Sequence, residues 1–178
     1  PWGVSSFYYA FVLCANRQLY KGASMPASWA DFWDTKRFPG PRVLHSGDNG
    51  ADGPWEFALL ADGVTADKLY PLDLDRAYRS LDKIKPHIRK WWKVGSEAQQ
   101  LFHDNVAHIG ENFEGRAIAM QDEGKPIELI WNQGKLAWNY WAIPKGAPNA
   151  ENAKKFIAFA IRGEQQVRHR VGRRRPEQ

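Results

Sequence analysis

The stretch Ser5-Ser6-Phe7-Tyr8-Tyr9-Ala10-Phe11-Val12-Leu13-Cys14-Ala15 is uncharged and dominated by aromatic, β-branched and other apolar residues. Such a run is typical of a strand that is buried inside a sheet. The single cysteine, Cys14, lies within it and has no partner for a disulfide inside the chain, so we expect a buried thiol that serves packing. The sequence therefore predicts a fold built on a buried strand.

Short strand-like segments alternate with helical segments along the rest of the chain. A capping-box-like pair, Ser28 and Asp31, begins the first predicted helix. Further helices are predicted at 54–61, 73–85, 96–103, 114–123 and 153–160, and strands at 42–44, 88–94, 107–110, 127–131 and 137–143. This alternation predicts an α/β fold with a mixed, mostly parallel sheet and flanking helices.

The overall charge is concentrated at the C-terminal end. The chain has 178 residues, 43% of them hydrophobic and 25% charged, and no apolar run approaches the roughly 20 residues that cross a bilayer. Its net charge is +5, and residues 162–178 hold six arginines against two glutamates, a net +4. We expect residues 167–178 to form a basic, disordered tail and expect no nucleic-acid partner. An interaction or nucleic-acid-binding module that uses this tail is the alternative.

The sequence contains no pattern that predicts catalysis or a bound cofactor. It has no nucleophile elbow, phosphate-binding glycine-lysine loop or dinucleotide-binding glycine motif. His103, Asp104 and His108 are close in sequence, but the two histidines lie on opposite sides of a helix-to-strand junction and do not share a face. We therefore predict no catalytic residue, no metal site and no cofactor.

Three junctions combine aromatic and polar residues, the first two with glycine as well: 53–56, 112–116 and 135–141. Junctions at the carboxyl ends of parallel strands converge on one crevice, where ligands usually bind. The candidate ligand-binding residues in these junctions are Trp55, Glu56, Phe113, Glu114, Trp138 and Asn139. Alternatives remain open: Trp55 can be a core anchor, and Glu56 and Glu114 can serve to complement helix N-termini.

Several motifs, in order, resemble one protein family. They are Ala58-Leu59-Leu60-Ala61-Asp62-Gly63-Val64, Leu69-Tyr70-Pro71-Leu72-Asp73, Leu81-Asp82-Lys83-Ile84-Lys85-Pro86, Trp91-Trp92, Ile130-Trp131-Asn132-Gln133-Gly134 and Trp141-Ala142-Ile143-Pro144-Lys145-Gly146-Ala147-Pro148-Asn149. Over residues 4 to 166 the chain resembles the polyamine-type (spermidine/putrescine-like) extracellular solute-binding proteins of ABC transporters.

The resemblance implies a type II periplasmic-binding-protein-like lobe with an incomplete first lobe. Residues 1–19 would be a crossover strand and a remnant of the first lobe, 20–135 the second-lobe α/β domain, and 136–166 the return crossover strand and helix. The implied function is non-catalytic capture of a small solute in a cleft between lobes, for delivery to an ABC permease. The full-length parent would be periplasmic, and we expect no signal peptide within this chain. A homodimer through the exposed cleft surface is a further expectation.

The family's binding residues are only partly present. Where the family that this chain resembles commonly has Trp-Asn-Gly-Arg, this chain has Phe113-Glu114-Gly115-Arg116. Asn139 stands where polyamine binders have an aspartate that pairs with a ligand ammonium group, and a neutral amide cannot supply that charge-assisted bond. The resemblance implies a polyamine or a similar small solute as ligand. Asn139 does not match a polyamine, but Glu56 and Glu114 could still face a cation.

Overall fold

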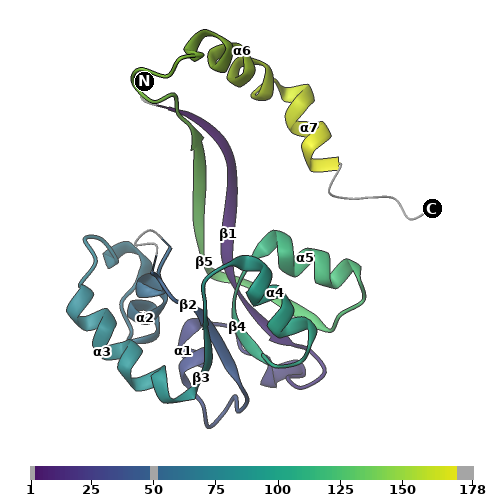
Figure 1. Ribbon diagram of the computed structural model, residues 1–178. Helices are drawn as coiled ribbons and strands as arrows, with labels where there is room; N and C mark the ends of the chain where they lie inside the picture. Colours follow the sequence, from purple (N-terminus) through teal and green to yellow (C-terminus); the bar gives the residue numbers. More distant parts are fainter. Residues whose placement is uncertain (1–2, 49–51, 172–178) are drawn as a thin grey trace. The chain divides into compact units, whose positions relative to one another are not determined.

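The computed structural model describes residues 3–48 and 52–171, which form two compact units (Figure 1). The first unit consists of Pro1–Tyr8 and Ala137–Gln178, and the second of Tyr9–Leu136. Two long strands, β1 (Val4–Asn16) and β5 (Ile127–Trp141), pass from one unit into the other. The resemblance predicted crossover strands at these two places in the sequence.

The five strands form one mixed sheet in the order β3-β2-β4-β1-β5. Strands β3 (Ile88–Trp92) and β4 (Ile109–Phe113) both run parallel to β2 (Arg42–His45), which lies between them. Strand β1 is antiparallel to β4. The fold class predicted from the sequence, an α/β arrangement with a mixed sheet, is confirmed, and its parallel part is β3-β2-β4.

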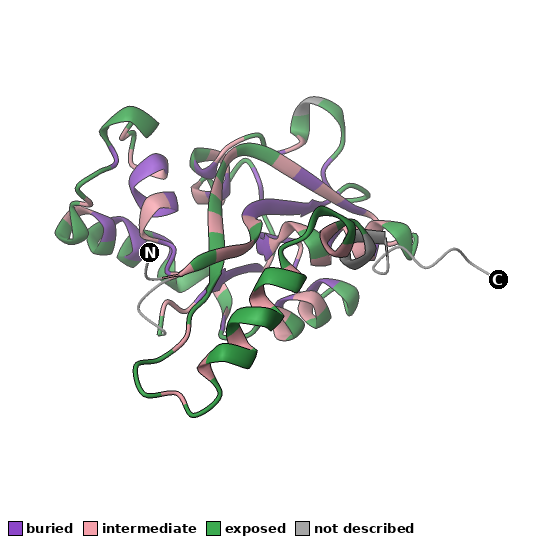
Figure 2. Ribbon diagram, turned by 90° about the horizontal axis from the view of Figure 1, so that it is seen from above, coloured by how far each residue is buried: buried purple, intermediate pink, exposed green. Residues whose placement is uncertain are grey.

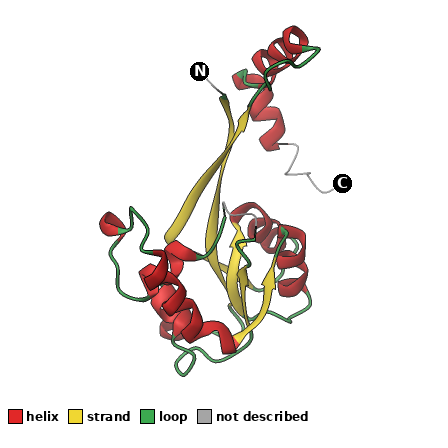
Figure 3. Cartoon of the chain, turned by 60° about the vertical axis from the view of Figure 1, so that its left-hand side comes forward, coloured by secondary structure: helices red, strands yellow, loops and turns green. Residues whose placement is uncertain are grey.

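Helices lie on both sides of the sheet in the second unit (Figure 3). Helices α1 (Trp29–Trp33), α2 (Trp55–Ala61) and α3 (Leu74–Ile84) form one group, and α4 (Gly95–His103) and α5 (Glu114–Asp122) form the other. Short 3-10 turns cover Gly22–Ser24, Ala66–Lys68 and Lys85–His87. No helix in the described part of the chain is long and apolar enough to span a membrane.

Side-chain caps explain where two of these helices begin. The Ser28 hydroxyl accepts a hydrogen bond from the Asp31 backbone N–H at 3.2 Å, as the capping-box pattern predicted. The Asp73 carboxylate accepts from the Arg76 N–H at 2.9 Å and starts α3 in the same way. Gly63 follows α2 with a φ of +86°, a left-handed conformation that glycine adopts without strain.

Among the described residues, every buried hydrophobic side chain lies in the second unit, and Figure 2 marks buried residues in purple. The sequence run that predicted a buried strand supplies Phe11, Val12, Leu13 and Cys14, all completely buried. Burial raises the pKa of the Cys14 thiol, which keeps it protonated and unreactive. The expectation of a buried packing thiol is therefore confirmed.

A buried arginine closes the connection between α1 and β2. Arg42 is 1% exposed, and its guanidinium donates to the backbone carbonyls of Phe32 at 2.8 Å, Gly40 at 2.8 Å and Phe38. A buried guanidinium needs acceptors for all its donors, and this loop supplies carbonyl oxygens in place of a carboxylate. Arg42 thereby fixes the loop that leads into the central parallel strand.

The predicted pair of strands at 127–131 and 137–143 is wrong, because β5 is continuous. Gln133 has a φ of +61°, which distorts the strand locally. Gly134 lies against the Phe11 carbonyl, so β5 stays beside β1 beyond that distortion. The polar segment Asn132-Gln133-Gly134 predicts a break because the sequence does not show that a neighbouring strand pairs with it.

The C-terminal part of the first unit is helical. Helix α6 (Ala150–Ala160) is followed by α7 (Gly163–Val171). The tail was predicted to begin at 167, whereas α7 extends to Val171. Residues 172–178, with the Arg173-Arg174-Arg175 run, lie outside the described residues.

Gly110 provides a stability test of the β2–β4 pairing. A Cβ at Gly110 would collide with the carbonyl oxygen of Val43, its register partner on β2. Gly110→Ala should therefore destabilise the protein by about 1–3 kcal/mol, the usual cost of overpacking a core. Gly163→Ala is the control, since nothing lies within 4 Å of the added carbon there. Equal urea-unfolding midpoints for the two variants would contradict the close approach of the strands.

Candidate functional site

Three helices begin at the edge of the sheet where the parallel strands end. Strands β2, β3 and β4 end at His45, Trp92 and Phe113, and α2, α4 and α5 start shortly after them. Because the strands are parallel, their carboxyl ends lie at the same edge. Trp55, Glu56, Phe113 and Glu114, the predicted site residues of the first two junctions, therefore follow strands that end at this edge, and all four lie in the second unit. Their role in binding a ligand stays a prediction.

An aromatic cluster, Tyr9, Phe11, Trp92 and Phe113, forms at this edge. The ring centroids of Phe11 and Phe113, register partners on β1 and β4, are 4.6 Å apart. Tyr9 lies 5.6 Å from Phe113, and Trp92 lies 5.8 Å from it. Phe113, a predicted site residue on β4, therefore lies against rings from β1 and β3. The contribution of Tyr9 and Phe11 was missed, because their run of sequence indicated only a buried strand.

Both predicted site carboxylates already have partners within the chain. Glu114 Oε2 accepts a hydrogen bond from the Ala10 N–H at 2.8 Å and so ties the start of α5 to β1. Glu56 Oε1 accepts from the Tyr70 hydroxyl at 3.0 Å, and Glu56 Oε2 pairs with Lys135 Nζ at 3.3 Å. Each glutamate lies in the first turn of its helix. Both carboxylates therefore already have partners on other parts of the second unit, and their position also complements the N-termini of α2 and α5.

Trp55 packs on the loop that precedes α2. Its ring occupies the space that a Cβ at Gly53 would need and lies close to Gly47. Gly47 in turn donates its backbone N–H to His45 Nδ1 at 3.0 Å. The indole thus braces the connection between β2 and α2 while remaining partly exposed.

Trp138 and Asn139 belong to the first unit, separate from the other four predicted residues. Both are exposed, and Trp138 lies 6.4 Å from Tyr8 and 6.5 Å from Tyr140, measured between ring centroids. They form an aromatic surface on paired strands. Their grouping with the second-unit residues stays a prediction.

A buried carboxylate that the sequence did not reveal lies on β4. Glu111 is completely buried, and its Oε2 accepts a hydrogen bond from the His45 backbone N–H at 2.9 Å. Its other oxygen has no hydrogen-bond partner. Burial raises the pKa of Glu111 to about 7, with the nearby charges of Glu56 and Asp52 adding to this and Lys135 opposing it. The prediction ended the strand at Gly110 and so left Glu111 in a loop.

The histidine beside Glu111 is held in its neutral form. Burial lowers the pKa of His45, and its Nδ1 accepts the Gly47 N–H, which leaves the ring proton on Nε2. The ring lies edge-on to Trp92, with centroids 4.5 Å apart. Within the described residues, no group of three or more His, Cys, Asp or Glu side chains is placed to hold a metal ion.

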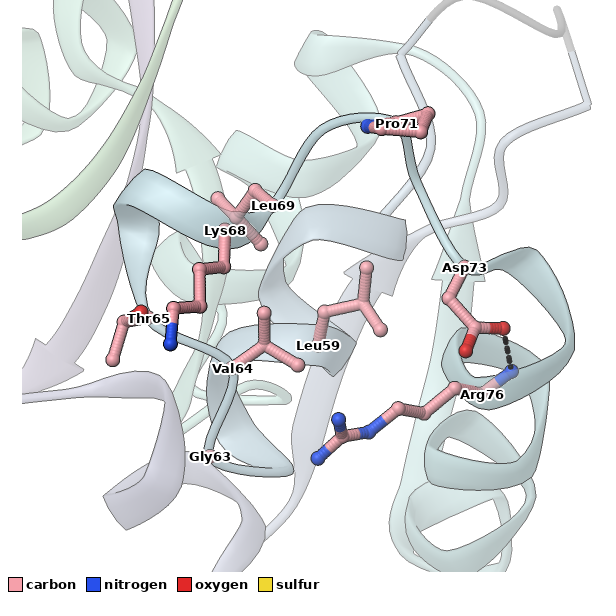
Figure 4. A pocket seen from close by; sticks show the side chains of 9 residues that line it. All are labelled: Leu59, Gly63, Val64, Thr65, Lys68, Leu69, Pro71, Asp73 and Arg76. Atoms are coloured by element: carbon pink, nitrogen blue, oxygen red, sulfur yellow. Dashed lines mark hydrogen bonds between the residues drawn. The ribbon is translucent and has the colours of Figure 1, made fainter.

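A separate pocket of about 360 Å³ lies between the end of α2 and the start of α3 (Figure 4). Lys68 and Arg76 are its basic members, and Arg76 already pairs with Asp62, with Nε and Oδ2 2.8 Å apart. None of the six predicted site residues lines it; the lining residues are Leu59, Gly63, Val64, Thr65, Lys68, Leu69, Pro71, Asp73 and Arg76. It therefore lies outside the candidate site.

Comparison with known proteins identifies the family. The family model described as bacterial extracellular solute-binding protein matches residues 1–171. The chain belongs to this family. It is 39% identical over 163 residues to the gamma-aminobutyric acid-binding protein of Pseudomonas aeruginosa, covering 89% of this chain and 45% of that protein. It is 27% identical over 149 residues to the spermidine/putrescine-binding periplasmic protein of Escherichia coli, covering 82% of this chain and 41% of that one.

Solved structures of the same family share the fold. A receptor described as Atu4243-GABA is 45% identical with a TM-score of 0.84, covering 93% of this chain and 50% of that one. AgtB from A. tumefaciens R10, in complex with agropinic acid, is 33% identical with a TM-score of 0.80, also covering 93% and 50%. The chain thus spans about half the length of the relatives it matches. The resemblance to polyamine binders is correct at the level of the solute-binding family, while its GABA-binding relatives are more similar.

The buried Glu111 predicts a pH-dependent stability. Its folded pKa lies above the value of an exposed glutamate, so its neutral form is favoured in the folded state, and wild-type stability should fall as the pH rises through about 7. Glu111→Gln, which stays neutral, should be more stable than wild type at alkaline pH, by about 1–3 kcal/mol near pH 8. Urea unfolding at about pH 5.5 and pH 8 measures the difference.

The control for this measurement is Glu123→Gln, which alters an exposed carboxylate in the same unit. It should reproduce the wild-type change of stability with pH. If Glu111→Gln also shows the wild-type change of stability with pH, Glu111 is not the group whose titration causes that change.

Proposed function

We propose that this chain is the larger part of one lobe of the solute-binding component of an ABC importer, without catalytic activity. The observation that carries the proposal is the family match over residues 1–171 together with 39% identity to a GABA-binding relative. Tyr9 and Phe113, the partly exposed rings of the aromatic cluster at the carboxyl edge of the sheet, support it, because aromatic faces at this edge of an α/β sheet are suited to small organic solutes. The parent protein would be periplasmic and would deliver its solute to a permease.

The solute we propose is a small molecule that carries both an amino group and an acid group, as GABA does. A polyamine, the solute implied by the resemblance, is less favoured for two reasons. The polyamine-binding relative is only 27% identical, and both candidate carboxylates, Glu56 and Glu114, already have partners within the chain. Trp138 and Asn139 would contribute from the first unit, with Asn139 offering a neutral amide.

Titration calorimetry with GABA, putrescine and spermidine tests this proposal. GABA should release saturable heat, and Phe113→Ala should weaken its binding about tenfold, since an aromatic face contributes roughly 0.5–2 kcal/mol to holding an ammonium group. Tyr78→Ala, which alters an exposed ring on α3, is the matched control and should leave the affinity unchanged. Absence of heat with every solute would contradict the proposed binding by this chain.

The predicted homodimer remains a proposal, now for a surface of the first unit. No described residue of this unit is buried, yet ten large apolar side chains are exposed, among them Trp138, Trp141 and Phe156. A pocket of about 470 Å³ lies between the strand ends and α6, lined by Gly3, Val4, Trp141, Ala142, Ile143, Lys154, Ile157, Ala158 and Ile161. Apolar surface of this extent marks an interaction site, and a second copy presents the complementary apolar face.

Light scattering during size exclusion should give about twice the chain mass of 20.4 kDa. Phe156→Glu and Phe159→Glu, which place charge on the exposed face of α6, should shift the dimer to monomer. Tyr78→Glu, on the second unit, should leave it dimeric. A monomer at all concentrations would contradict the dimer and favour coverage of this face by the portion of the family fold that the chain does not match.

A further inference from the structure

A lysine of the chain itself occupies a site built for an ammonium group. Lys135, near the middle of β5, donates from Nζ to the Gly53 carbonyl at 2.8 Å and pairs with Glu56 Oε2 at 3.3 Å. The same nitrogen lies 5.0 Å from the ring centroid of Phe11 and 5.3 Å from that of Phe57. The Lys135 and Glu56 side chains are each only 13% exposed.

These groups have the chemistry that recognises a cationic ligand. Two aromatic faces attract a cation electrostatically, and a carboxylate and a carbonyl accept its N–H donors. Phe11 and Phe57 are completely buried, so water competes little for the ammonium group. We name this set, Phe11, Gly53, Glu56 and Phe57, the ammonium cage.

Both oxygens of the cage carboxylate already have a partner among the described residues. Glu56 Oε2 is taken by Lys135, and Oε1 accepts from the Tyr70 hydroxyl. A second ammonium group brought to Glu56 would meet the positive charge of Lys135 in a water-poor setting, where like charges repel strongly. A polyamine could therefore use Glu56 only after Lys135 had left the cage.

We infer that Lys135 determines the charge selectivity of the site, because its ammonium group occupies the cage and excludes solutes that would place a second ammonium beside Glu56. The inference rests on the proposed solute-binding function and narrows its substrate class to solutes with at most one ammonium group at this position. Lys135 acts as an internal counter-cation to Glu56. Because the charge of Glu56 is neutralised, it does not repel the acid group of a solute.

Chemical rescue tests the cage directly. Lys135→Ala removes the ammonium group and three of the four stem carbons, since alanine keeps Cβ, and n-propylammonium has the same atoms as the lost part. Added n-propylammonium should raise the unfolding temperature of Lys135→Ala saturably, while n-propanol, of the same size but uncharged, should bind at least about tenfold more weakly, because it gains neither the cation–π nor the ion-pair contact. Lys135→Met fills the same space without charge and should show no rescue.

The same variants test selectivity. Putrescine should bind Lys135→Ala at least about tenfold more tightly than it binds wild type, since the vacated cage accepts one of its ammonium groups. Equal rescue by n-propanol, rescue of Lys135→Met, or no rescue of a folded Lys135→Ala would each overturn the inference. Wild-type binding of putrescine as tight as that of GABA would overturn it too, although the proposed function would stand. Failure of wild type to bind any solute would remove the proposed function without affecting the rescue result.

A second measurement needs no substitution of Lys135. Limited acetylation followed by mass spectrometry should modify Lys135 far more slowly than the exposed Lys145, and Glu56→Gln should speed modification of Lys135 alone. Equal reaction rates of Lys135 and Lys145 in wild type would show that the ammonium group is not held, even if Lys135→Ala fails to fold.

Discussion

The close approach of β4 to β2 at Gly110 is the constraint on which the second unit depends. Any side chain at this position would collide with the carbonyl of Val43. Because the two parallel strands lie so close, their carboxyl ends deliver α2 and α5 to one edge of the sheet. The next residue along β4, Glu111, is fixed in the core by the same pairing. The position of the candidate site therefore follows from a glycine and a backbone contact.

Burial of Glu111 has electrostatic consequences for its neighbours. A carboxylate removed from water is costly unless it is neutral or compensated. Here the His45 N–H supplies one hydrogen bond, and the positive charge of Lys135 opposes the rise in the pKa of Glu111. The same Lys135 pairs with Glu56. The Lys135 ammonium group thus offsets the negative charge of both Glu56 and Glu111. The sequence predicted that Glu56 faces a cation, and within the fold that cation is Lys135.

Local signals predicted the elements well, and non-local contacts account for the errors. Ser28 and the buried run around Phe11 were identified because capping and hydrophobicity are properties of neighbouring residues. The continuity of β5 through Gln133 was missed because pairing with β1 maintains it. Residue types and junctions selected Phe113 and Glu56 correctly as members of the edge, but not their contacts. Their partners Phe11 and Lys135 come from distant strands, and no local pattern links them.

The first unit shows the complementary limit of sequence patterns. The spacing of Phe156 and Ile157 predicted an amphipathic helix, and α6 is present, yet none of its residues is buried. A hydrophobic pattern states which face of a helix needs a partner surface, but it does not say that the same chain provides one. The chain matches only about half the length of its relatives, and its two units differ in how much apolar surface they expose. The second unit buries its own hydrophobic core. The first unit exposes apolar side chains, which only a further protein surface could bury.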